Sequence, residues 1–274
     1  MIDKYAVLGN PIGHSKSPII HAEFAKQTKQ GMSYEAILAP LDGFFDTANR
    51  LVAEGYKGVN VTVPFKFEAF DMAKHIDASA LVAKASNTLA FHEGSATAYN
   101  TDGIGLVADI QKNLATPLQG KRVLMIGAGG AAQGVAIEIA KANPATFVVV
   151  NRTVGKVHDM QKKLESAKEQ DIVAITASSF NGLDGQVFDV VINATSAGLT
   201  DSVLLIPESI FTSNTLAYDM MYGRETPFMA QARSAGAQVA DGLGMLVEQA
   251  AEAFSIWRGV KPDTKPVIAT IRAL

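Results

Sequence analysis

Short apolar runs rich in Val, Ile and Leu alternate with helical patterns along the whole chain. Such alternation is typical of βαβ units, in which mostly parallel strands form a sheet and helices cover its faces. In the first third of the chain we expect strands at residues 5–8, 33–38, 58–63, 87–91 and 97–99. The helices expected between these strands are 18–29, 42–54 and shorter segments within 65–84.

The middle of the chain repeats this pattern more sharply. Apolar residues at Ile104, Val107, Ile110 and Leu114 have helical spacing, which predicts a helix over 103–114. Further strands are expected at 122–126, 146–150, 172–176, 189–193 and 216–219, with one helix ending at 142 and another over 154–165. This succession predicts a doubly wound sheet.

The C-terminal segment is different, because it consists of two predicted helices, 245–258 and 262–273, with no strand between them. A helical tail cannot extend a sheet, so we expect it to pack against another domain. At about 150 residues per domain, a chain of 274 residues suggests two domains. The predicted fold class is therefore α/β with two domains.

Composition narrows the possible functions. The chain is 48% hydrophobic and 19% charged, which is typical of a globular protein, and its formal net charge of −3 disfavours nucleic-acid binding. It contains no cysteine, and its five histidines lack metal-ligand spacing, so we expect no disulfide and no metal site. Without a signal peptide or a long apolar run we expect a cytoplasmic protein with no membrane partner.

A glycine-rich turn follows the predicted strand at 122–126. Gly127, Gly129 and Ala132 have the spacing G-x-G-x-x-A between a strand and a helix. The first glycine permits a tight turn, the second lets a pyrophosphate approach the helix N-terminus, and the alanine keeps the helix close to the strand. Such a turn also occurs in α/β folds that bind no nucleotide, but the strand and the βα unit around it favour a dinucleotide site.

The residues after the next strand distinguish between two possible dinucleotides, NAD and NADP(H). NAD sites usually have a carboxylate at the end of the second strand, where it binds the ribose hydroxyls. Here that strand is followed by Asn151, Arg152 and Thr153, with no acid. The planar guanidinium of Arg152 suits a 2′-phosphate, and Lys156 would add positive charge. A solvated arginine in a turn is the alternative, but the missing carboxylate favours NADP(H).

Three polar clusters follow predicted strands, where ligands of α/β sheets gather. The first contains Ser15 and Ser17, and Ser17 is also a plausible N-cap of the next helix, with Pro18 as its first residue. The second contains Lys66, which can exchange a proton if it is sheltered but is otherwise an ordinary helix-surface lysine. The third contains Asp102, which is equally well explained as a helix N-cap.

Taken together, these residues resemble the NADP-dependent shikimate dehydrogenase family of aromatic amino-acid and chorismate biosynthesis. The similarity consists of nine short strings in the family's order, spread over nearly the whole chain. The strings are GNPIGHSKSP (9–18), NVTVPFK (60–66), NT (87–88), NTDG (100–103), GAGGA (127–131), NRT (151–153), NATSAG (193–198), YDMMYG (218–223) with TPF (226–228), and DGLGMLVEQ (241–249).

The resemblance implies a substrate domain of residues 1–101 with 242–274 and an inserted Rossmann domain, 102–241, that binds NADP(H). It implies the reaction 3-dehydroshikimate + NADPH ⇌ shikimate + NADP⁺, with Lys66 and Asp102 as the catalytic pair. The implied substrate-binding residues are Ser15, Ser17, Thr62, Lys66, Asn87, Asp102, Tyr222 and Gln249. The implied cofactor-binding residues are Gly127, Ala128, Gly129, Gly130, Ala131, Asn151, Arg152, Thr153, Lys156, Met220 and Gly242.

Two features depart from the family pattern. Before Asn87 the family usually has a Gly-Ala-Val turn, whereas this chain has Lys84, Ala85 and Ser86, and Ala78 stands where the family often has an acid. Two other functions stay open at this point: a quinate/shikimate dehydrogenase of the same fold, and a non-catalytic NADP(H)-binding sensor. We expect a monomer or a homodimer that acts on a small molecule.

Overall fold

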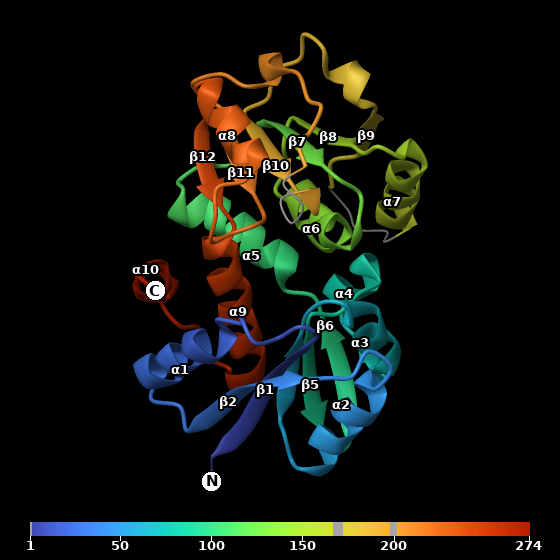
Figure 1. Ribbon diagram of the computed structural model, residues 1–274. Coiled ribbons are helices and arrows are strands. Elements are labelled where there is room, and N and C mark those ends of the chain that lie inside the picture. The colour runs from blue at the N-terminus through green and yellow to red at the C-terminus, as the bar shows by residue number, and fades with distance from the viewer. Residues whose placement is uncertain (1, 167–171, 198–201) are drawn as a thin grey trace. The chain divides into compact units, whose positions relative to one another are not determined.

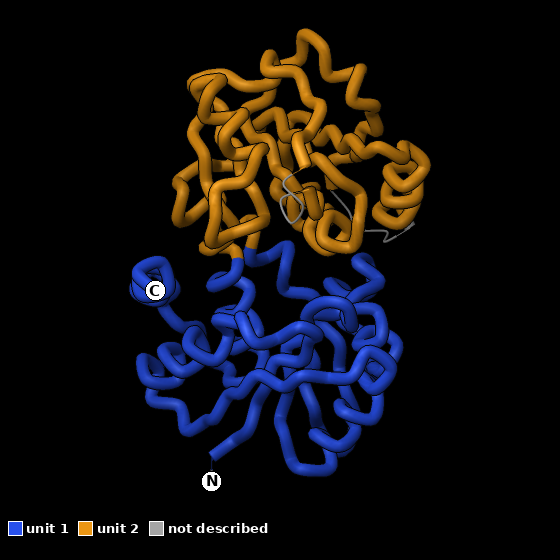
Figure 2. Tube along the Cα trace, in the orientation of Figure 1, with its two compact units in different colours: residues 1–105, 246–274 blue, residues 106–245 orange. Residues whose placement is uncertain are grey.

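The computed structural model describes residues 2–166, 172–197 and 202–274 (Figure 1). The chain divides into two compact units, residues 1–105 with 246–274 and residues 106–245 (Figure 2). The domain boundaries predicted from the sequence, after residues 101 and 241, lie a few residues before those of these units. The difference arises because the chain passes between the units inside helices α5 (Asp102–Ala108) and α9 (Leu243–Arg258) rather than in loops.

A six-stranded mixed sheet forms the centre of the first unit. Its strand order is β2-β1-β3-β5-β6-β4, and β1 is parallel to both β2 and β3, whereas β5 is antiparallel to β3 and β6. The strands are β1 (Asp3–Gly9), β2 (Met32–Leu38), β3 (Gly58–Val61), β4 (His75–Ile76), β5 (Thr88–His92) and β6 (Ser95–Tyr99). All five strands predicted in this part are confirmed, and the two-residue strand β4 was not expected.

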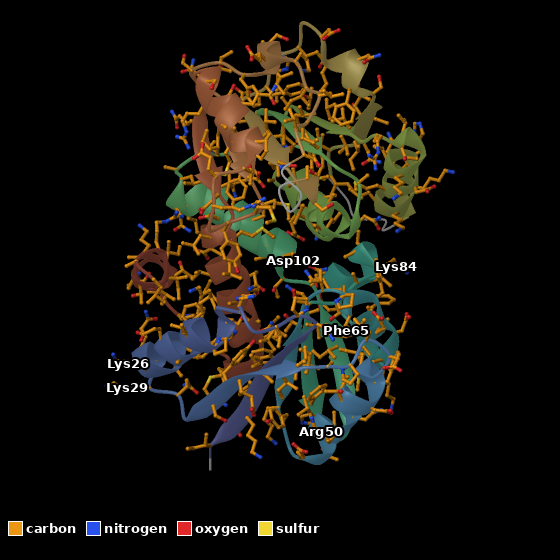
Figure 3. The ribbon with its side chains drawn as sticks, viewed as in Figure 1. Lys26, Lys29, Arg50, Phe65, Lys84 and Asp102 are labelled. Atoms are coloured by element: carbon orange, nitrogen blue, oxygen red, sulfur yellow. The ribbon has the colours of Figure 1, made fainter. Side chains whose placement is uncertain are left out.

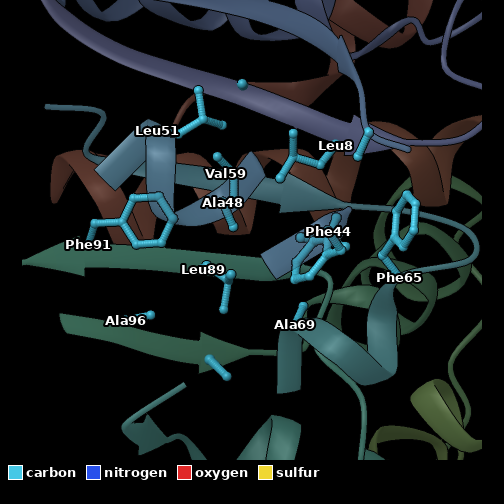
Figure 4. Packing of buried hydrophobic residues seen from close by; sticks show 14 of the residues in the cluster. Leu8, Phe44, Ala48, Leu51, Val59, Phe65, Ala69, Leu89, Phe91 and Ala96 are labelled. Carbon is cyan, nitrogen blue, oxygen red and sulfur yellow. The ribbon is translucent and has the colours of Figure 1, made fainter. Parts of the chain in front are cut away.

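Apolar side chains on one face of this sheet pack beneath helices α2 (Phe44–Ala53) and α3 (Lys66–Met72). Leu8, Val59 and Leu89 come from the strands, and Phe44 and Phe65 cover them (Figure 4). The two phenylalanine rings stack with centroids 5.3 Å apart. Phe65 is fully buried and precedes Lys66 directly, so the core fixes the point at which α3 begins.

The opposite face of the sheet contacts α1 (Ser17–Thr28) and the C-terminal half of α9. Trp257 of α9 stacks on Tyr5 of β1, with ring centroids 4.8 Å apart, and its indole N–H donates to the carbonyl of Leu89. The last helix, α10 (Thr264–Arg272), belongs to the same unit. The expectation that the helical tail packs on a domain formed earlier in the chain is therefore confirmed.

The second unit contains a parallel six-stranded sheet with the order β12-β11-β10-β7-β8-β9. The order reverses between β7 and β10, and ligands of doubly wound sheets bind at such a point. The strands are β7 (Arg122–Ile126), β8 (Thr146–Val150), β9 (Ile175–Ser178), β10 (Val190–Asn193), β11 (Leu216–Asp219) and β12 (Gln238–Asp241). The helices are α6 (Gly130–Lys141), α7 (Val154–Ser166) and α8 (Pro227–Ser234).

Three details of the second unit differ from the sequence-based expectations. The strand predicted at 172–176 lies later, at Ile175–Ser178, because its pairing with β8 begins at Ile175. Helix α8 and strand β12 were not predicted, because both are short and only part of their surface is apolar. The predicted helix 103–114 is α5 followed by a π-helical turn over Asp109–Asn113.

The first polar cluster follows β1 at a point where two segments approach closely. Gly9, the last residue of β1, lies against Thr62, which follows β3. A Cβ atom on Gly9 would be 2.5 Å from Cγ2 of Thr62 and 3.0 Å from Cδ1 of Ile12. A glycine at this position lets the ends of β1 and β3 lie side by side.

We expect Gly9→Ala to lower the free energy of unfolding by about 1–3 kcal/mol, the usual cost of forcing extra volume into a packed region. Gly13→Ala is the matched control, because a Cβ atom there has nothing within 4 Å. Urea unfolding of both variants measures the effect. Equal stabilities would contradict the close packing of Gly9 against Thr62.

Candidate active site

Strand directions bring three separated segments to one edge of the first sheet. Asn60 of β3 pairs with Thr88 of β5, and Thr88 pairs with Tyr99 of β6. Because β5 is antiparallel to its neighbours, its first residue lies beside the last residues of β3 and β6. The chain before β5 and the chain after β3 and β6 therefore meet at this edge.

Lys66 and Asp102 form an ion pair at this edge. Nζ of Lys66, the first residue of α3, is 2.5 Å from Oδ2 of Asp102, the first residue of α5. The Asp102 side chain is 12% exposed and that of Lys66 is 29% exposed. Figure 3 labels Asp102 and also Phe65, the buried residue next to Lys66. The ammonium thus has a sheltered carboxylate partner and keeps an accessible surface.

The side chain of Asn87 ties the aspartate to the rest of the edge. Its Nδ2 donates to Oδ1 of Asp102 at 2.8 Å and lies 2.9 Å from Oγ1 of Thr101 and 3.2 Å from Oε1 of Gln249. Its Oδ1 accepts the backbone N–H of Thr101 and the hydroxyl of Thr88. Asn87 is 3% exposed, so these contacts satisfy an otherwise buried carboxamide.

The structure corrects the expectation that Ser17 caps α1. The helix begins at Ser17 itself, Lys16 is the N-cap, and no side chain caps this end. Instead, Oγ of Ser15 accepts the backbone N–H of Ser17 at 3.3 Å. Ser17 itself is buried.

The N-cap explanation of Asp102 is also incorrect. Asp102 is the first residue inside α5, and its two carboxylate oxygens accept from Lys66 and Asn87. Its backbone N–H is bound by the side chain of Asn100, and the carbonyl of Thr101 accepts the first bond of the helix. The carboxylate is therefore turned toward the polar cluster.

Two residues of this edge were inside the matched strings but had no role assigned from sequence. Asn60 donates to the carbonyl of Asn87 and to Oγ1 of Thr88, and Thr101 shares the contacts of Asn87 described above. Both are buried polar residues at strand ends. A polar side chain that ends an otherwise apolar strand was the signal that could have identified them.

In the second unit, the glycine turn joins β7 to α6. Gly127 has a φ of +114°, and a Cβ atom there would be 3.0 Å from the carbonyl oxygen of Ala194. A Cβ on Gly129 would have nothing within 4 Å. Helix α6 begins at Gly130 and no side chain caps it, so the backbone N–H groups of its first turn attract anions.

A cavity of about 740 Å³ lies over this turn. The turn residues Gly127, Ala128, Gly129, Gly130 and Ala131 line it together with Asn151, Arg152 and Lys156 from the end of β8 and the start of α7. Residues 194–197, which follow β10, form another wall. The last residue of the matched string 193–198 lies outside the described residues.

The remaining predicted cofactor residues lie elsewhere in this unit. Thr153 does not line the cavity, but its carbonyl accepts the side chain of Asn151 and closes the turn after β8. Met220 and Gly242 contact each other, because a Cβ on Gly242 would be 2.3 Å from the carbonyl oxygen of Met220. Neither lines the cavity. Their roles stay predictions.

Tyr222 was predicted to bind substrate and belongs to the second unit. It is half-buried, and burial raises the pKa of its hydroxyl, which therefore stays protonated at neutral pH. No group of three or more His, Asp or Glu side chains within the described residues could hold a metal ion. None of the described helices is long and apolar enough to cross a membrane.

Three family models match segments of this chain. Residues 7–89 match the shikimate dehydrogenase substrate-binding domain, 109–203 match the shikimate/quinate 5-dehydrogenase domain, and 242–272 match the shikimate 5′-dehydrogenase C-terminal domain. A curated relative from Methylobacillus flagellatus, named shikimate dehydrogenase (NADP(+)), is 54% identical over 99% of this chain and 100% of its own length. This chain belongs to the shikimate dehydrogenase family.

Solved structures of other proteins have the same fold as this chain. An Ael1 enzyme from Pseudomonas putida is 45% identical with a TM-score of 0.92, covering 98% of this chain and 97% of that one. Shikimate 5-dehydrogenase from Thermus thermophilus, in complex with NADP(H) and shikimate, is 29% identical with a TM-score of 0.85 and covers 100% of both chains. The family and the α/β fold class expected from the sequence are confirmed.

Asp102→Asn tests the ion pair in this shikimate dehydrogenase family member. The asparagine keeps the size of the side chain but must turn its NH₂ group toward one of two donors, Lys66 or Asn87. We expect the free energy of unfolding to fall by about 1–3 kcal/mol, the cost of leaving a buried donor without an acceptor.

Asp77→Asn is the matched control. Asp77 caps α4 (Ala78–Ala83) by accepting the backbone N–H of Ser79, and asparagine caps a helix about as well as aspartate. Its stability should change by no more than a few tenths of a kcal/mol. Urea unfolding of both variants decides the matter, and equal small effects would mean that Asp102 serves only the helix end.

Proposed function

We propose that this protein catalyses the reversible, NADPH-dependent reduction of 3-dehydroshikimate to shikimate. The observation that carries the proposal is the contact between Lys66 and Asp102, which places a proton donor and an orienting carboxylate at one edge of the sheet. Full-length relatives named as NADP-dependent shikimate dehydrogenases support it. We assign substrate binding to the predicted domain 1–101 with 242–274 and cofactor binding to 102–241.

The second unit has features that fit NADP(H). Gly129 leaves the backbone open to a pyrophosphate, and the start of α6, which no side chain caps, favours its negative charge. Arg152 and Lys156 line the same cavity and carry the positive charge that a 2′-phosphate requires. No carboxylate follows β8 to bind ribose hydroxyls, as an NAD site would require.

Residues of the first unit transfer the proton. The chemistry that NADPH supplies when bound is donation of a hydride to the ketone. The oxygen of that ketone then needs a proton, and the Lys66 ammonium both stabilises the developing negative charge and donates. Asp102 holds the ammonium in place, and Asn87 holds Asp102. In the direction of shikimate oxidation, Lys66 accepts the proton.

Hydroxyl and amide groups around this pair are suited to a polyhydroxylated carboxylate. We assign the carboxylate of shikimate to Ser15 and Ser17, and its hydroxyls to Thr62, Asn87 and Gln249. Substrate binding by Tyr222 stays a prediction. Gln249 lies beside Asn87, and Ser15 contacts the backbone of Ser17. A small polar substrate thus has donors and acceptors on several sides.

Lys66→Ala should lower kcat by about 10²- to 10⁴-fold, the usual effect of a positioned general acid–base, with a smaller change in KM. The assay follows NADPH absorbance with shikimate and NADP⁺. Lys57→Ala, which removes an exposed lysine from the same unit, should leave the rate unchanged. Near-normal turnover of the Lys66 variant would contradict the assigned role.

Arg152→Ala should weaken NADP⁺ binding about tenfold to a hundredfold, because a charge-assisted contact to the 2′-phosphate is lost. Binding of NAD⁺, which lacks that phosphate, should change little. Fluorescence titration measures both cofactors, and Arg233→Ala removes an exposed arginine that pairs with Glu225 in the same unit as a control. Equal weakening of both cofactors would show that Arg152 only supports the fold.

The same absorbance assay separates the remaining functions. Shikimate and quinate are each tested with NADP⁺ and NAD⁺, and the proposal expects the highest kcat/KM with shikimate and NADP⁺. A dominant rate with quinate would indicate a quinate/shikimate dehydrogenase. Tight NADPH binding with no turnover would indicate a sensor. A cytoplasmic location and a monomeric or homodimeric state stay predictions.

A further inference from the structure

The side chain of Tyr34 reaches across a strand of the first sheet to the polar edge. Tyr34 lies on β2 and its hydroxyl donates to Oδ1 of Asn60 on β3 at 2.7 Å. Strand β1 lies between them, with Tyr5 paired to Tyr34 and Val7 paired to Asn60. Two strand spacings amount to about 10 Å, so only a long side chain with a terminal polar group can make this contact.

The ring of Tyr34 is held rigidly by aromatic neighbours. His21 of α1 stacks on it with ring centroids 4.1 Å apart and an angle of 8° between the planes. Burial lowers the pKa of His21 to about 3, so its imidazole is neutral at physiological pH and packs as an aromatic ring. Trp257 of α9 lies 6.3 Å from the Tyr34 ring. The hydroxyl group therefore has a fixed position.

Helix α1, which carries Ser17, packs on Tyr34 through His21. Burial raises the pKa of Tyr34 well above its usual value, and a hydrogen bond with the Ser17 side chain opposes that rise. Asn60, on the other side, donates to the carbonyl of Asn87 and to Thr88. Contacts thus run from α1, through the stacking of His21 on Tyr34, to Asn60 and Asn87, and Asn87 binds Asp102.

We propose that Tyr34 is a positioning residue that fixes Ser15 and Ser17, the serine cluster, relative to the Lys66–Asp102 pair. The inference rests on the proposed function, in which Ser17 binds the substrate carboxylate and Lys66 serves the reacting oxygen. The substrate carboxylate and the reacting oxygen are attached to one rigid ring, so Ser17 and Lys66 must lie at a set separation for the substrate to contact both at once. Tyr34 is the link between α1, which carries Ser17, and β3, which leads to Lys66.

Tyr34→Phe removes the hydroxyl and keeps the ring that stacks on His21. We expect KM for shikimate to rise about 3- to 10-fold, the usual net effect of one hydrogen bond, with kcat changed less than about twofold. KM for NADP⁺ should not change. A structural role alone would lower the melting temperature without this selective rise in one KM.

Tyr56→Phe is the matched control. The Tyr56 hydroxyl also donates to a β2 side chain, Glu35, which is the neighbour of Tyr34 on the opposite face of the sheet. Each variant loses one tyrosine hydroxyl whose hydrogen bond involves a residue of β2. Tyr34, however, packs on His21 of α1, the helix that carries Ser17. The control should keep the wild-type KM for shikimate.

A double-mutant cycle tests the route through Ser17. In a Ser17→Ala background, Tyr34→Phe should change KM for shikimate by no more than about twofold, because the residue that it positions is already lost. An undiminished effect in that background would overturn the inference.

The wild-type assay separates this inference from the proposed function. An active wild-type protein whose KM for shikimate is unchanged by Tyr34→Phe would overturn the positioning role alone. A wild-type protein that does not oxidise shikimate with NADP⁺ would overturn the proposed function and the positioning role together. A selective rise in KM, lost in the Ser17→Ala background, supports both.

Discussion

A carboxylate that is withdrawn from water must be matched by donors, because an unpaired buried charge costs several kcal/mol. Asp102 meets this requirement with Lys66 on one oxygen and Asn87 on the other. Both partners must therefore lie at the edge where β6 ends. Asn87 in turn needs acceptors and donors of its own, which Thr88, Thr101 and Gln249 supply. The need to satisfy one aspartate thus fixes the arrangement of four chain segments.

The mixed direction of the strands makes this arrangement possible. In a wholly parallel sheet, only residues that follow strands would reach the ligand-binding edge. In the first unit β5 runs antiparallel to β3 and β6, so Asn87, which precedes β5, joins Lys66 and Asp102, which follow strands. The second unit has a parallel sheet, and there the residues that line the cavity follow β7, β8, β9 and β10. One chain thus forms polar sites from two kinds of sheet edge.

The sequence predicts the strands, the main helices and the glycine turn, because apolar period and glycine spacing are local properties. It also brings attention to Lys66 and Asp102 separately, but their contact depends on the pairing of β3, β5 and β6, which no local pattern specifies. The same limit explains the error at Ser17. A serine followed by proline is typical of a helix start, yet here Lys16 occupies the cap and Ser17 is buried. Tertiary contacts outweigh local capping preferences at such positions.

The segment before Asn87, residues 84–86, contacts the elements that carry both members of the ion pair. Lys84 adopts a φ of +51°, a conformation that glycine would adopt more easily, and its Nζ lies 5.6 Å from the centre of the Phe70 ring (Figure 3 labels Lys84). Ser86 is fully buried, and its hydroxyl lies 2.9 Å from the carbonyl of Thr88 and 3.0 Å from that of Tyr99. Its backbone N–H donates to the carbonyl of Lys66 at 2.8 Å. The hydroxyl of Ser86 thus binds β6, and its backbone N–H binds α3. Since Lys66 begins α3 and Asp102 follows β6, these two hydrogen bonds of Ser86 help to hold both members of the ion pair in place.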